Sequence, residues 1–68
     1  MDINFIKGKA IIKVNKKIVA KVYDRMEFFK GTKYENTFKQ FPFSVEMLGG
    51  CFECKNFEET KEILNKYL

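Results

Sequence analysis

Histidine and tryptophan are absent from this 68-residue chain, and proline and arginine occur once each. Without histidine, the chain lacks the usual general base at neutral pH and the commonest metal ligand. A single proline and a hydrophobic content of 46% are inconsistent with a Pro-rich linker or a disordered tract. These absences favour a folded protein that is not an enzyme.

Long apolar runs are also missing. No stretch approaches the roughly 20 apolar residues that a membrane-spanning helix needs. The first residues carry an acid at Asp2 and lack the apolar segment of a signal peptide. We therefore expect a soluble, cytoplasmic protein that has no membrane partner.

The chain has room for one hydrophobic core and is predicted to be a single domain, residues 1–68. Eight Phe and three Tyr provide large side chains for that core, since one aromatic buries about 150–250 Å².

Residues 9–23 predict a β-hairpin. Two segments rich in β-branched side chains, 9–14 and 18–23, flank Asn15-Lys16-Lys17. A three-residue loop pairs apolar with apolar residues, whereas a two-residue loop sets Val14 against Lys17. We predict the longer loop and this inner face: Ala10, Ile12, Val14, Ile18, Ala20 and Val22. Residues 2–6 alternate weakly and are interpreted as the start of the first strand, with a bulge at Gly8.

Gly49-Gly50, between residues 44–48 and 51–55, predicts a second hairpin with a two-residue turn of positive φ. This register pairs Leu48 with Cys51 and sets Glu46 opposite Glu53 on the solvent side. The predicted core face holds Val45, Met47, Phe52 and Cys54.

A C-terminal amphipathic helix is predicted to follow. Asn56 is a suitable N-cap residue, and Glu59 three positions later completes a capping-box pattern. The apolar stripe of this helix is Phe57, Thr60, Ile63, Leu64, Tyr67 and Leu68. The fold class is therefore α+β: a small antiparallel sheet of two main hairpins, with about four to five strands, packed against one C-terminal α-helix.

The segment between the hairpins is less regular. Residues 26–30 predict a further short strand that ends at Gly31-Thr32. Residues 33–43 are interpreted as an irregular loop or a short strand. Tyr34, Phe38 and Phe41 have helical spacing, but Pro42 keeps any helix there short.

Cys51 and Cys54 suggest a metal or redox site at first. One CxxC supplies only two of the four ligands of structural zinc, and a redox CxxC begins at a helix N-terminus. Here both cysteines fall in a predicted strand, where residues three apart point to opposite faces. We interpret Cys54 as a core residue and Cys51 as an outward one, with a metal-bridged dimer as the alternative. We expect no metal, no cofactor and no catalytic residue.

The basic residues concentrate in the first half of the chain. Residues 1–33 carry nine Lys or Arg and three acids, whereas residues 34–68 carry four Lys and six Glu. The outward face of the first hairpin mixes lysines with apolar and aromatic side chains, and the following aromatic segment carries more lysines. The candidate partner-binding residues are Lys9, Ile11, Lys13, Lys16, Lys17, Lys21, Tyr23, Arg25, Lys30, Lys33, Tyr34 and Phe38.

Our leading hypothesis is a non-enzymatic accessory protein of a phage or mobile element. It would bind a host protein and act as a stoichiometric inhibitor or modulator, for example of a nucleic-acid-handling defence enzyme such as a CRISPR effector. Half of the chain is Lys, Asn, Ile, Phe and Tyr, whose codons are AT-rich, as in many bacteria and their phages.

The alternative is a small nucleic-acid-binding protein that uses the basic hairpin against DNA or RNA. Its sequence specificity would be weak, because twelve of the thirteen cations are Lys and base recognition relies on Arg. A homodimer is a third hypothesis. Lysines that serve only to keep the protein in solution are a fourth.

Overall fold

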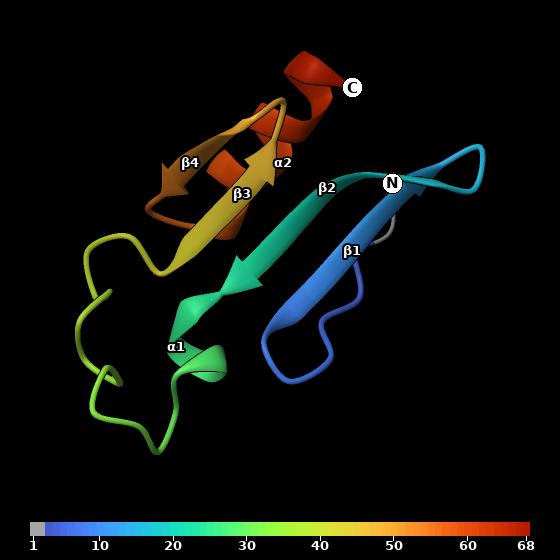
Figure 1. The fold of residues 1–68 in the computed structure, drawn as a ribbon. Coiled ribbons are helices and arrows are strands. Elements are labelled where there is room, and N and C mark those ends of the chain that lie inside the picture. The colour runs from blue at the N-terminus through green and yellow to red at the C-terminus, as the bar shows by residue number, and fades with distance from the viewer. Residues whose placement is uncertain (1–2) are drawn as a thin grey trace.

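Four strands form one antiparallel sheet in the computed structural model, which describes residues 3–68 (Figure 1). The strands are β1 (Lys9–Val14), β2 (Lys17–Asp24), β3 (Phe43–Met47) and β4 (Gly50–Cys54), and they lie in the order β1-β2-β3-β4. Two helices complete the fold: α1 (Arg25–Phe28) after β2, and α2 (Phe57–Tyr67) after β4. The predicted α+β class is confirmed. Asp2, which was assigned to the first strand, lies outside the described residues.

The order of the strands decides what lies at each end of the sheet. In this meander both hairpin turns lie at one end, and the β2–β3 connection with α1 lies at the other (Figure 1). Helix α2 starts beside the end of β4 and runs back toward the turns. None of the helices in residues 3–68 is long and apolar enough to cross a membrane.

One face of the sheet carries the core. Alternate residues of the strands point to this face, and Leu64 of α2 packs against them. The aromatic rings of Phe5, Phe43 and Phe57 close one side of the core, with centroids 5.8–6.1 Å apart. The buried apolar residues are Ala10, Ile12, Ala20, Val22, Val45, Met47, Cys54 and Leu64.

The predicted loop of the first hairpin is wrong by one residue. Asn15 and Lys16, with φ of 52° and 69°, form a two-residue turn, and Val14 pairs with Lys17. A bulge then leaves Val19 unpaired and restores the predicted pairing between Ile12 and Ala20. The two-residue turn is favoured over the three-residue loop because two residues of positive φ match the twist of the flanking strands. Two residues of the predicted inner face are consequently 47% and 54% exposed, Val14 and Ile18.

The second hairpin shows a similar shift. Its turn is Leu48-Gly49, with φ of 54° and 75°, so Val45 pairs with Phe52 rather than with Cys54. Glu46 faces Cys51, and the predicted Glu46–Glu53 pair is wrong. Because the pairing moves by two positions, each side chain stays on its predicted face. The predicted core face of this hairpin is therefore correct.

Two other local predictions fail. The bulge at Gly8 is a tight turn, in which Ile6 and Lys9 form an isolated bridge with backbone N···O distances of 2.8 and 3.2 Å. The strand predicted at residues 26–30 is replaced by α1, because the Asp24 side chain accepts a hydrogen bond from the Glu27 N–H and caps a helical turn. Residues 29–42 then follow as a chain of turns, which agrees with the loop interpretation.

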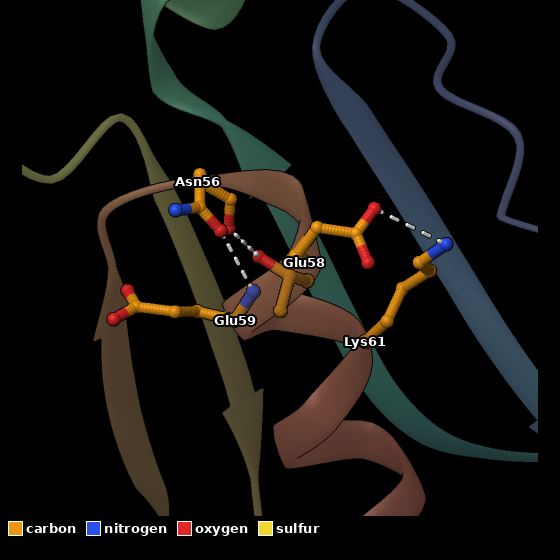
Figure 2. A network of polar contacts seen from close by, with 5 residues as sticks. Asn56, Glu58, Glu59 and Lys61 are labelled. Carbon is orange, nitrogen blue, oxygen red and sulfur yellow. Dashed lines mark hydrogen bonds and ion pairs between the residues drawn. The ribbon is translucent and has the colours of Figure 1, made fainter.

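The cap of α2 is confirmed (Figure 2). The Glu59 N–H donates to the Asn56 side-chain oxygen at 2.9 Å. The Glu59 carboxylate accepts from the Lys55 N–H at 2.6 Å, one residue earlier than the capping-box pattern predicts. An exposed ion pair of 3.5 Å joins Glu58 and Lys61. These contacts fix where α2 starts.

Candidate functional site

The face of the sheet opposite α2 carries a groove of about 860 Å³. Strand alternation places on this face Tyr23 of β2, Ser44 and Glu46 of β3, and Cys51 of β4. The groove runs along these strands from the hairpin turns toward α1. Its far end is closed by aromatic side chains, which belong to Phe28, Phe29 and Phe38.

Arg25 holds the closed end of the groove together. Its side chain is only 11% exposed, and its Nη2 atom donates a hydrogen bond to the Phe41 carbonyl at 2.7 Å. The same atom lies 3.5 Å from the Glu53 carboxylate, and the guanidinium lies over the Phe38 ring, 4.1 Å from the centroid. The Arg25 backbone N–H donates to the Pro42 carbonyl. One residue thus folds the segment 29–42 back against β2 and β4.

The aromatic side chains at this end form a connected cluster. Tyr23 and Phe28 meet edge to face at 5.3 Å, and Phe28 meets Phe29 in the same way at 4.9 Å. Phe29 in turn stacks on Phe38 at 5.2 Å and contacts Tyr34 at 5.8 Å. Such pairs are each worth about 0.5–1.5 kcal/mol beyond the area that they bury. Phe28 and Tyr34 nevertheless keep almost half of their surface exposed.

Tyr23 and Glu46 form the polar floor of the groove. Burial raises the pKa of the Tyr23 hydroxyl, and its hydrogen bond to the Glu46 carboxylate raises that pKa further, because both favour the neutral phenol. Lys21 lies opposite Glu46 in the β2–β3 register, but it forms no ion pair with any residue from 3 to 68. The Lys9 ammonium lies 5.9 Å from the Tyr23 ring centroid. The floor is therefore a neutral phenol and a carboxylate beside lysines.

The two cysteines lie where strand alternation predicts. Cys51 is exposed and lines the groove, whereas Cys54 is fully buried under α2. Burial raises the pKa of the Cys54 thiol, and its hydrogen bond to Thr60 opposes part of that rise. Within the described part of the chain, no group of three or more His, Cys, Asp or Glu side chains could hold a metal ion.

The structure divides the predicted binding residues into three groups. Lys21, Tyr23, Arg25 and Phe38 line the groove. The outward residues of β1 and the first turn lie beside it or beyond it: Lys9, Ile11, Lys13, Lys16 and Lys17. The remaining three, Lys30, Lys33 and Tyr34, lie in the segment from residue 29 to 42, with the Lys33 ammonium 5.1 Å from the Tyr34 ring centroid.

Several groove residues were not predicted as site residues. Ser44, Glu46 and Cys51 lie on the outward face of the second hairpin. Of these, only Glu46 and Cys51 were predicted to face outward, and neither was predicted to bind a partner. Phe28 and Phe29 were assigned to a strand. Alternation along the second hairpin supplied the signal for the first three, but only the pairing of β2 with β3 brings them beside Tyr23.

No protein-family model matches the chain, and neither the curated proteins nor the solved structures include a match to it.

Proposed function

We propose that this chain is a non-enzymatic protein-binding protein whose uncovered sheet face docks on a partner protein. The observation that carries this proposal is the groove of about 860 Å³, closed at one end by the aromatic cluster. Protein interfaces are enriched in aromatic and Arg side chains, and their strongest contacts are anchors that fill pockets. Phe28, which is partly exposed beside Tyr23, supplies a wall for such an anchor.

Three features of this face favour a protein over a nucleic acid. Phe29 stacks on Phe38 and the Arg25 guanidinium lies over the Phe38 ring, so Phe38 offers little surface for stacking bases. Arg25 is committed to Phe41 and Glu53. The carboxylates of Glu46 and Glu53 on the same face would repel a phosphate backbone.

The partner is a host protein in the cytoplasm, and the chain is a phage or mobile-element product that inhibits or modulates it by covering a surface. A nucleic-acid-handling defence enzyme, such as a CRISPR effector, is one such host protein. The abundance of residues with AT-rich codons supports this origin. The effect would require one copy per partner, because covering a surface involves no turnover.

Affinity capture with matched variants tests the proposal. Cys51→Arg places a long cation in the groove, and Asn65→Arg makes the same charge change on α2, which covers the other face. In nuclease-treated bacterial lysate, wild type and Asn65→Arg should retain a stoichiometric protein partner, and Cys51→Arg should lose it. Circular dichroism checks that both variants fold. Equal retention by the two variants, or loss of every partner after nuclease treatment, would contradict the proposal.

A further inference from the structure

The distal half of the first hairpin projects beyond the rest of the sheet (Figure 1). β2 pairs with β3 only over residues 21–24 and Ala20 still belongs to the core, so residues 13–18 form the projecting two-stranded ribbon, which we call the arm. The two-residue turn at Asn15-Lys16 keeps the tip of the arm narrow. The arm is therefore a thin element that can enter a groove of another molecule.

The arm is basic and partly apolar. Residues 3–23 include six lysines and no Asp or Glu. Lys13, Lys16 and Lys17 of the arm are exposed, and none forms an ion pair with any residue of the described chain. Val14 and Ile18 are about half exposed beside them. This charge repels a second copy of the arm and attracts a polyanion.

We propose that the arm enters the major groove of B-form duplex DNA, as a second binding site that borders the groove on the sheet face and shares only Ile18 with it. The major groove of B-DNA is about 12 Å wide and admits a two-stranded β-ribbon. The lysines would reach the phosphates on either side. Because Lys13 pairs with Ile18 and Val14 pairs with Lys17, the two apolar side chains lie on opposite faces of the ribbon, and the one that faces the base edges would contact thymine methyl groups. The major groove of A-form RNA is too narrow for side chains to enter, so duplex RNA is a poor substitute.

The number of lysines sets the expected strength and salt dependence. Three phosphate contacts give a slope of about −2.7 for the logarithm of the binding constant against that of salt concentration. Affinity should therefore fall about 40-fold between 50 and 200 mM salt. Sequence preference should be weak, because lysine acts as a point charge and the arm has no arginine.

Fluorescence anisotropy with a labelled DNA duplex of about two helical turns tests the site. The arm variant changes Lys13, Lys16 and Lys17 to Gln, and its control changes Lys39, Lys55 and Lys66 to Gln, so both have the same net charge. We expect the arm variant to lose at least about tenfold in affinity together with most of its salt slope, and the control to stay within about threefold. Val14→Ser with Ile18→Ser should weaken binding without changing the slope.

Three results would overturn the inference: no binding of the DNA duplex by wild type at 50 mM salt, equal losses in the arm variant and its control, or equal affinity for an RNA duplex of the same sequence. The test is independent of the proposed protein partner. The arm variant should still retain that partner in nuclease-treated lysate, so failure of one site is distinguishable from failure of the other.

Discussion

The guanidinium of Arg25 lies over the ring of Phe38, with 4.1 Å between its Cζ atom and the ring centroid. The two residues are thirteen positions apart, and their contact closes the segment between them into a loop over one end of the groove. Because Arg25 also binds the Phe41 carbonyl and Glu53, the shape of the closed end depends on this one side chain.

Replacing Arg25 should therefore destabilise the fold. Arg25→Ala removes a hydrogen bond from a charged donor in a largely buried position, which costs about 1.5–3 kcal/mol. Arg25→Lys should recover little of this free energy, because lysine lacks the planar fork. Urea unfolding monitored by circular dichroism measures both.

Glu53→Gln is the matched control for Arg25→Ala, because it removes only the ion pair. The Glu53 side chain is 54% exposed, so solvent screens its ion pair, and the expected cost is below about 1 kcal/mol. Equal costs for Arg25→Ala and Glu53→Gln would mean that the ion pair, rather than the Phe41 and Phe38 contacts, holds the loop.

Gly8 should tolerate no side chain. Its φ is +81°, and a Cβ atom there would lie 2.4 Å from the Phe28 backbone nitrogen and 2.8 Å from the Asp24 carbonyl oxygen. Gly8→Ala therefore combines left-handed strain with a clash against backbone and should cost at least about 3 kcal/mol. Gly31→Ala has the same φ and open space, so it should cost only about 1–2 kcal/mol. Similar unfolding midpoints for the two variants would contradict the close packing at Gly8.

Leu48 should be replaceable with a gain in stability. It has a φ of 54° in the second turn and is 73% exposed, so it bears backbone strain and buries little apolar surface. Leu48→Asn creates Asn-Gly, the favoured pair for this turn, and should raise the free energy of unfolding by about 1 kcal/mol. Thermal and urea unfolding measure the gain.

Gly50→Ala tests independently whether the turn of the second hairpin is Leu48-Gly49 or Gly49-Gly50. Gly50 begins β4 without a positive φ, and the nearest atom to its Cβ would be the Met47 carbonyl oxygen at 3.9 Å. A cost below about 1 kcal/mol is expected for this strand position. A larger cost would instead favour a turn at Gly49-Gly50.

The two cysteines should differ in the rate at which their thiols are alkylated. Cys51 is exposed, whereas Cys54 is fully buried and its thiol pKa is raised by that burial. Since the thiolate is the reactive form, iodoacetamide should modify Cys51 at least about 100 times faster than Cys54 in the folded protein. Mass spectrometry should detect one adduct before denaturation and two after it. Two adducts of equal rate in the folded protein would place Cys54 outside the core.

Tyr23 should contribute to the alkaline unfolding of the protein. Its pKa is raised in the fold by burial and by Glu46, so the folded state holds the phenolic proton more tightly than the unfolded chain does. Stability should therefore decrease as the pH rises above about 10, the unfolded pKa of tyrosine. Glu46→Gln should lower the titration midpoint of Tyr23 in ultraviolet absorbance, and Tyr23→Phe identifies that transition. An unchanged midpoint in Glu46→Gln would rule out the carboxylate as a cause.

The sequence by itself determined the elements whose signals are local. Alternation predicted the four strands and their faces apart from Val14 and Ile18 beside the first turn, and Asn56 with the stripe through Leu64 predicted α2, because side-chain period and capping act within a few residues. The first turn is one residue shorter than predicted and the second begins one residue earlier than predicted, since Asn15-Lys16-Lys17 and Leu48-Gly49-Gly50 each allow two choices of turn. Backbone twist decided between those choices, and the bulge at Val19 absorbed the difference in the first hairpin.

Only the tertiary structure decided the candidate site. The outward direction of Tyr23 and Cys51 follows from their strands, but their position in one groove depends on the pairing of β2 with β3 and of β3 with β4. Arg25 reaches Glu53, 28 residues away, only across that sheet. Such contacts depend on strand register and on the path of residues 29–42, which no short-range pattern specifies. The projection of the arm has the same origin, because β3 ends beside the middle of β2 and leaves residues 13–18 as a projecting ribbon.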